Sequence, residues 1–356
     1  MADDNRTAEI LFERRGAAGL ITLNRPQALN AVTHGMVLAL RTQLDDWADD
    51  PAVTRVVITG AGGKAFSAGG DIRHLYDLGK AGRRDEALQF WRDEYPLNVA
   101  IKNYRKPYVA LIDVIVMGGG VGVSVHGSHR VAGDRFSFAM PEVGIGFFPD
   151  VGATWFLPRM PGELGTYCAL TGDRFNAADG VSAGIATHRI PSARFADLLD
   201  GLTGTVSVDA LLAAFAEQAE EGPIAAQREI IDRLFKGDSV DHILDALDGE
   251  AAAGGDTAVW AAKIAATLRT KSPLSLKLAL AQVRHGGTCD FETCMRMEMR
   301  IVSRVIEGHD FYEGVRAVIV DKDNKPQWKP PELSQVSAQD VERHFAVLDG
   351  AELALP

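Results

Sequence analysis

The chain has 356 residues, of which 46% are hydrophobic and 24% charged, and this ordinary globular mixture excludes a mainly disordered or fibrous protein. The net charge of −11 argues against a uniformly basic surface for nucleic acid, although local cations and backbone N–H groups can still hold a phosphate-bearing ligand. Three cysteines without a Cys-x-x-Cys pair are too few for a disulfide framework.

The N-terminal segment 1–7 is polar and acidic, so we expect no signal peptide there. We find no apolar stretch long enough to span a membrane. Together with the sparse cysteines, these features predict a soluble, cytoplasmic protein that binds neither membrane nor nucleic acid.

The first two-thirds of the chain alternates between strand and helix patterns, which favours an α/β fold. Thr33 is placed to cap an amphipathic helix, because Val37, Leu40, Leu44 and Trp47 share one face. A second helix is expected over 83–103, and a short apolar helix through Val125 after the glycines at 118–122. The expected strands lie at 19–23, 53–59, 107–113, 129–132 and 136–139.

The pattern changes near residue 190, after which strand signals nearly vanish. The sequence therefore predicts a core over 1–190 and a mainly helical C-terminal region over 191–356. Helices are expected at 210–221, 227–235, 242–247, 259–270 and 274–284.

Two glycine-rich segments follow predicted strands. In 64–72 (KAFSAGGDI), small residues let the backbone approach a ligand, and the Gly70 N–H is placed to face developing negative charge. The alternative is an ordinary turn in which Asp71 starts a helix. The segment 117–122 (MGGGVG) would present free N–H groups at a helix start, or serve only close helix packing. It matches neither the dinucleotide-binding pattern nor a Walker loop.

A third segment, 138–150, holds two carboxylates, Glu142 and Asp150, among apolar residues and glycines. Desolvation there would raise the pKa of either carboxyl, which suits a general base or a nucleophile. The alternative is a pair of acids on a surface loop.

These segments, in this order and spacing, resemble the crotonase (enoyl-CoA hydratase/isomerase) superfamily, whose N-terminal signature also matches Leu23-Asn24-Arg25-Pro26. The resemblance implies a spiral of ββα units that binds acyl-CoA, with an oxyanion hole formed by the N–H groups of Gly70 and Gly119. It places Ala68, Asp71 and Ile72 at the substrate.

Hydratases of this superfamily carry two glutamates, and the first of these positions is Gly122 here, which counts against water addition. Over nearly the whole chain the sequence is similar to the branch that hydrolyses 3-hydroxyisobutyryl-CoA in valine degradation. The segments that carry this similarity include Trp91–Tyr95, Met117–Gly127, Met140–Gly152, Ala183–His188, Gly308–Ala317 and Asp321–Pro330. The alternatives are an enoyl-CoA hydratase or isomerase of the same superfamily, and a non-catalytic acyl-CoA-binding protein.

The resemblance implies that Glu94, Gly119, Glu142 and Asp150 form the acyl site. Glu142 would attack the thioester carbonyl or activate a water, Asp150 would bind the substrate hydroxyl or handle the water, and Glu94 would orient that hydroxyl. A similar short 3-hydroxyacyl group, such as 3-hydroxypropionyl, differs by about one methyl and is not separated by the sequence.

We expect no cofactor and no metal, because the histidines show no ligand spacing and coenzyme A belongs to the substrate. Arg25 and Lys64 are the cations nearest the motifs; they either meet the coenzyme phosphates or are solvated surface charges. A homo-oligomer is possible.

Overall fold

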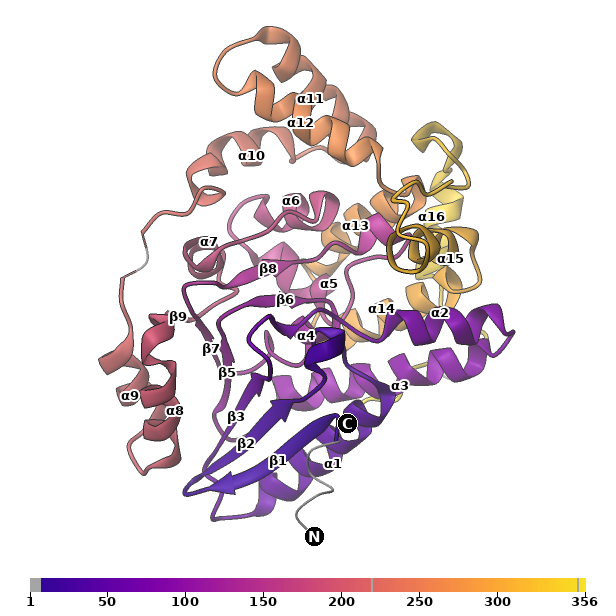
Figure 1. Cartoon of the computed structure of the whole chain (residues 1–356). Coiled ribbons are helices and arrows are strands. Elements are labelled where there is room, and N and C mark those ends of the chain that lie inside the picture. Colours follow the sequence, from indigo (N-terminus) through magenta and orange to yellow (C-terminus); the bar gives the residue numbers. More distant parts are fainter. Residues whose placement is uncertain (1–7, 219, 351) are drawn as a thin grey trace.

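The computed structural model describes residues 8–218, 220–350 and 352–356. The segment 1–7, on which the expectation of no signal peptide rests, lies outside this range. The described elements form one sheet-based core with helices around it (Figure 1).

Two sheets make up the strand content of the described residues. The larger has the order β1-β2-β3-β5-β7-β9, antiparallel between β1 and β2 and parallel elsewhere, and the smaller has the parallel order β4-β6-β8. The strands are β1 (Ile10–Arg15), β2 (Ala18–Leu23), β3 (Arg55–Gly60), β4 (Ala65–Ser67), β5 (Tyr108–Ile112), β6 (Ile115–Met117), β7 (His129–Ala132), β8 (Ser137–Ala139) and β9 (His188–Arg189).

A repeated strand–strand–helix unit places the functional segments together. In each unit the first strand joins the larger sheet and the second joins the smaller one, before the chain enters a helix. The units are β3–β4–α2 (Ile72–Lys80), β5–β6–α4 (Gly119–Gly122) and β7–β8–η3 (Glu142–Ile145). Because β4, β6 and β8 are parallel neighbours, the turns after them meet at one edge of the small sheet. This is the ββα spiral that the resemblance implies, and the predicted fold class is confirmed.

The large sheet is covered on both faces. Alternating residues such as Ile21, Ile58 and Ala110 pack in the main core with helices α1 (His34–Asp49) and α3 (Arg84–Lys102). The opposite face packs against α8 (Phe195–Thr203) and α9 (Val208–Phe215). As predicted, Thr33 caps α1, and its hydroxyl accepts a hydrogen bond from the Met36 N–H.

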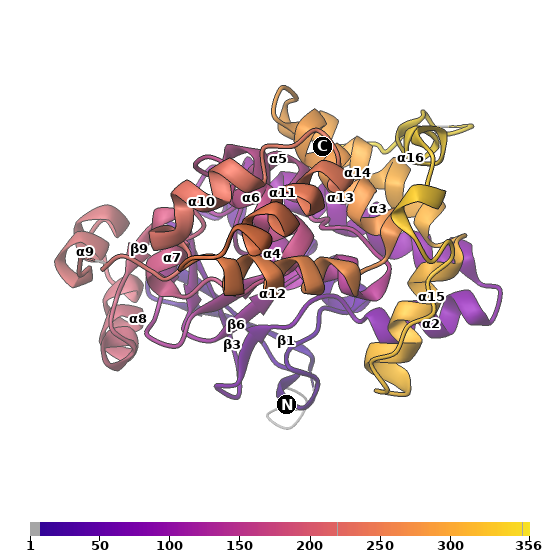
Figure 2. The ribbon, with the colours of Figure 1, turned by 90° about the horizontal axis from the view of Figure 1, so that it is seen from above.

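Helices dominate the rest of the chain. They are α5 (Ala153–Phe156), α6 (Leu164–Thr171), α7 (Ala177–Ser182), α10 (Arg228–Leu234), α11 (Val240–Ala253), α12 (Ala258–Arg269), α13 (Pro273–Gly286), α14 (Phe291–Val305), α15 (His309–Val315) and α16 (Ala338–Phe345). Helices α11 and α12 pack as a projecting pair, and α15 lies beside α2 (Figures 1 and 2). Helix α14 contacts α3 and α5, so C-terminal helices reach the core.

Two predicted helices are shorter than expected. The helix predicted at 210–221 ends at Phe215, because Ala216 turns extended and Glu217 forms a bridge with Arg189 of β9. The glycine-rich helix ends at Gly122 rather than continuing through Val125. Within the described residues after Arg189 no further named strand occurs, and the division into 1–190 and 191–356 stays a prediction.

Candidate active site

A cavity of about 830 Å³ opens at the edge of the small sheet where the three turns meet. It brings together residues from every segment predicted to form the site. These are Ala68, Gly70, Asp71, Ile72, Glu94, Gly119, Glu142 and Asp150. Phe90, Trp91 and Phe147 supply an apolar wall, and the Trp91 and Phe147 rings stack with their centroids 5.7 Å apart.

Gly70 and Gly119 hold their backbone nitrogens close together. A Cβ built on Gly119 would lie 3.0 Å from the Gly70 nitrogen and 2.9 Å from Glu94 Oε1. Neither N–H donates a hydrogen bond to another group in the described part of the chain. Two free N–H groups side by side in a cavity can stabilise an oxyanion.

Glu142 faces these glycines. It is the first residue of η3, and its Oε1 would lie 3.4 Å from a Cβ on Gly118. The residue is 7% exposed, and Oε2 has no partner among the described residues. Burial, reinforced by the nearby Asp150, raises the pKa of Glu142 well above its usual value. The carboxyl is therefore a strong base or nucleophile whenever it is ionised.

One face of helix α3 carries Trp91, Glu94 and Tyr95 into the site. The Tyr95 hydroxyl donates a 3.1 Å hydrogen bond to Asp150 Oδ2, which fixes that carboxyl against the cavity wall. Burial raises the pKa of Asp150 to about 7, although hydrogen bonds from Tyr95 and Trp91 act in the opposite direction. Burial and the charges of Asp150 and Glu298 raise the pKa of Glu94, whose Oε1 has no partner in the described residues.

The turn after Asp150 is strained, and side chains that sequence reasoning missed hold it in place. Val151 has φ +53°, an uncommon value for a β-branched residue. Glu298 of α14 accepts hydrogen bonds from the Gly152 N–H at 2.8 Å and the Thr154 N–H at 2.9 Å. His126 bonds the Val151 carbonyl oxygen at 2.6 Å. Burial lowers the pKa of His126 to about 3, so its ring is neutral and Nε2 donates.

The signal for Glu298 is present in the sequence. It lies at helical spacing on the buried stripe of α14, between Cys294 and Val302. A carboxylate on an apolar stripe needs partners, and here they are backbone N–H groups. His126 carries no comparable signal.

Other predicted residues have more local roles. Asp71 lines the cavity, but its carboxylate caps α2 and pairs with Arg25 at 3.0 Å. Neither Arg25 nor Lys64 lines the cavity, and Arg25 is also paired with Glu9. The cavity's own cations include Lys271 and Lys322.

Position 122 has no room for a side chain. A Cβ on Gly122 would lie 2.8 Å from Val151 Cβ and 2.9 Å from Asn98 Nδ2. Asn98 and the strained turn therefore leave no space here for the glutamate that the resemblance implies at this position in a hydratase.

The described part of the chain covers residues 8–218, 220–350 and 352–356. No group of three or more His, Cys, Asp or Glu side chains there is arranged to hold a metal ion. No helix in the same residues has the length and apolarity needed to cross a membrane.

The fold and site define a class of protein. Residues 18–345 match the family model described as enoyl-CoA hydratase/isomerase. The chain belongs to this family, within the crotonase superfamily.

Individual relatives are similar over the whole chain. A zebrafish (Danio rerio) protein described as 3-hydroxyisobutyryl-CoA hydrolase, mitochondrial, is 46% identical, covering 100% of this chain and 94% of that protein. The Xenopus laevis protein of the same description is 45% identical, covering 97% and 90%. A crystal structure described as a carnitinyl-CoA dehydratase from Mycobacterium thermoresistibile has a TM-score of 0.92 and 42% identity, covering 98% and 99%.

The predicted cytoplasmic location is contradicted by these relatives, since both hydrolases are described as mitochondrial. An acidic globular composition occurs in both compartments, so composition and charge do not separate them.

Proposed function

We propose that this chain hydrolyses 3-hydroxyisobutyryl-CoA to 3-hydroxyisobutyrate and coenzyme A, a reaction of valine degradation, without a cofactor. The observation that carries the proposal is the buried carboxyl of Glu142 facing two free N–H groups, beside a position 122 where a second glutamate cannot fit. The names of the hydrolase relatives agree with this reaction.

The thioester oxygen lies between the N–H groups of Gly70 and Gly119, which polarises the carbonyl carbon. A carboxylate oxygen of Glu142 then bonds to this carbon, the carbon–sulfur bond breaks, and coenzyme A leaves as the thiolate. Water attacks the resulting anhydride, which releases the hydroxy acid and frees Glu142. Asp150 takes one proton from this water and later gives it up to the thiolate, and the second proton of the water leaves with the hydroxy acid.

The alternative role for Glu142 is to deprotonate a water that attacks the thioester directly. In a single turnover in heavy-oxygen water with enzyme in excess, label in Glu142 together with its own unlabelled oxygen in the product shows that water opened an anhydride at the glutamyl carbon. Water attack at the acyl carbon of an anhydride labels only the product, as direct attack on the thioester does, so a hydroxylamine trap is run beside the first experiment. A hydroxamate on Glu142 shows the anhydride, and an unmodified Glu142 in both experiments favours direct attack.

Glu94 Oε1 has no hydrogen-bond partner among the described residues, and it would lie 2.9 Å from a Cβ on Gly119, beside the oxyanion hole. We assign it the 3-hydroxyl of the substrate. Lys271 and Lys322 are the cations we assign to the coenzyme phosphates, in place of Arg25 and Lys64.

A different reaction of the same superfamily is the second candidate, because the mycobacterial relative is described as a dehydratase. The test measures thiol release from 3-hydroxyisobutyryl-CoA beside loss of the enoyl absorbance of crotonyl-CoA. We expect thiol release without hydration. Hydration without thiol release would reject the proposal and favour the second candidate.

A further inference from the structure

A second polar pocket lies apart from the substrate cavity, and the two have none of their described lining residues in common. It has a volume of about 350 Å³ and lies between the end of α3, the segment 125–130, helix α5 with the turn after it, and the loop 183–185. His126, which bonds the Val151 carbonyl, is in its wall, so the pocket is next to the turn that follows Asp150. We call it the cationic pocket.

Three cations line the cationic pocket: Lys102, Arg130 and Arg159. No Asp or Glu is among its described lining residues, and none of the three cations forms an ion pair within the described part of the chain. Lys102 Nζ lies 4.0 Å and the Arg159 guanidinium 4.6 Å from the centroid of the Trp155 ring, so two positive charges share one aromatic ring. In a chain of net charge −11, this concentration of positive charge is unusual.

The local structure balances this charge only in part. Arg130 donates to the carbonyl oxygens of Gly127, Gly184 and Ile185, and Arg159 to those of Trp155, Gly286 and Cys289. These are dipoles rather than charges. The end of α3, where Lys102 lies, adds about half a negative charge. Burial, followed by the charges of Arg130 and Arg159, lowers the pKa of Lys102.

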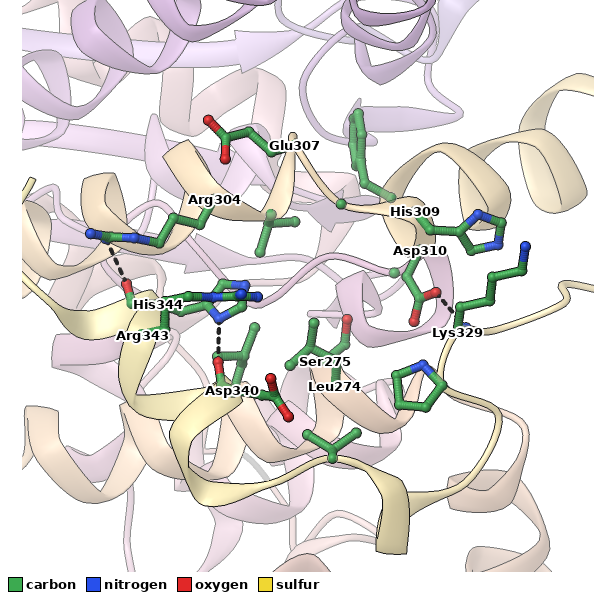
Figure 3. A pocket seen from close by; sticks show the side chains of 17 residues that line it. Leu274, Ser275, Arg304, Glu307, His309, Asp310, Lys329, Asp340, Arg343 and His344 are labelled. Carbon is green, nitrogen blue, oxygen red and sulfur yellow. Dashed lines mark hydrogen bonds between the residues drawn. The ribbon is translucent and has the colours of Figure 1, made fainter.

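The pocket in Figure 3, between α13, α15 and α16, provides a contrast. It also contains cations, among them Arg304, Lys329 and Arg343, but Asp310 and Asp340 lie in the same wall. That pocket therefore has acidic side chains beside its cations, whereas the described lining of the cationic pocket has none.

We propose that the cationic pocket is a binding site for a small oxyanion of the phosphate or carboxylate class. Arg130 and Arg159 each have five N–H donors, of which three are used. The remaining donors and the Lys102 ammonium are the groups that bind the anion. Planar guanidinium groups suit the geometry of both anion types.

The test is thermal unfolding of the full chain at neutral pH in phosphate, acetate or chloride of equal ionic strength. We expect phosphate, acetate or both to raise the Tm by about 2 °C over chloride, because a ligand that binds only the folded state stabilises it. If the Tm rises in phosphate alone, the natural ligand carries a phosphate group. If the Tm rises in acetate, the natural ligand carries a carboxylate. Equal Tm values in all three salts would overturn the proposal.

The Lys102→Met variant locates the effect. It keeps the apolar stem against Trp155, and its Tm in chloride should equal or exceed that of the parent because a repelled charge is gone. We expect it to lose the rise in phosphate or acetate. Lys263→Met removes an exposed charge from α12 and should keep the rise.

Lys322→Met removes a cation from the substrate cavity, the other place where phosphate would bind, and should also keep the rise. If Lys102→Met keeps the rise in Tm, or if only Lys322→Met loses it, the anion binds outside the cationic pocket and the proposal is rejected. The parent could also show no anion effect while Lys102→Met has a lower oligomeric mass than the parent. That result would reject the proposal, because the pocket would then bind a carboxylate from a second copy of the chain.

Discussion

Replacing Gly119 by alanine tests whether its N–H group belongs to an oxyanion hole. In Gly119→Ala the Cβ would lie 3.0 Å from the Gly70 nitrogen and 2.9 Å from Glu94 Oε1, in the space assigned to the thioester oxygen. We expect thiol release to fall by at least about 100-fold, the typical effect of losing one oxyanion donor. Gly249→Ala on α11 is the control, because a Cβ there meets no atom within 4 Å. Equal activity of both variants would show that Gly119 does not bind the oxyanion.

The pH dependence of kcat/KM reports the ionisation of the buried carboxyl groups in the active site. Burial raises the pKa of Glu142 well above its usual range and that of Asp150 to about 7. Both groups act in their ionised forms, so activity should fall as the pH drops below about 7 and the carboxylates gain protons. A rate that stays constant down to pH 5 would mean that neither group has to lose a proton in this range. The pH profile of thiol release at low substrate concentration provides the measurement.

At the scale of elements, helix α14 holds the turn that follows Asp150. Glu298→Gln keeps the shape of the side chain, but its NH2 group cannot accept a hydrogen bond and replaces one of the two carboxyl oxygens that accept from the Gly152 and Thr154 N–H groups. We expect kcat to fall by roughly 10-fold with little change in KM, because the turn loses one contact while the substrate cavity stays intact. Steady-state kinetics measures this split. A rise in KM alone would instead assign Glu298 to substrate binding.

Glu298 also makes stability depend on pH. Burial raises its pKa from 4.5 to about 8, so the folded chain holds a proton that the unfolded chain releases above pH 4.5. The free energy of unfolding therefore falls as the pH rises from about 4.5 to 8, and the glutamine variant lacks this loss. We expect the Tm of Glu298→Gln, relative to the parent, to increase steadily across this range. Glu307→Gln, at an exposed site just beyond α14, should show a constant difference.

The sequence predicted elements whose signals are local. Thr33 and the stripe from Val37 to Trp47 define helix α1, and the glycines after two strands mark the turns that meet at the cavity. It did not predict the contacts of Glu298 with Gly152 and Thr154, which join α14 to a turn far away in the chain. Such pairs depend on how helices pack over the core.

At the scale of the whole molecule, the spiral explains why distant motifs form one site. Each unit places its second strand in the small sheet, so the turns bearing Gly70, Gly119 and Glu142 meet at one edge. The order of these motifs can be predicted from the sequence alone. For Arg25 the sequence left open a coenzyme phosphate or a solvated surface charge, and the structure pairs that cation with Glu9 and Asp71. Lys271 and Lys322 reach the cavity from C-terminal segments that lie far in the chain from the three motifs of the core.

The most direct measurement is the turnover of 3-hydroxyisobutyryl-CoA by Glu142→Gln beside its binding of the same thioester. The variant keeps the volume of a side chain that is 7% exposed but loses its nucleophilic and basic oxygen. We expect thiol release to fall by at least about 1,000-fold while the Kd for the thioester changes little. Retention of parental turnover would contradict the assignment of the chemistry to Glu142.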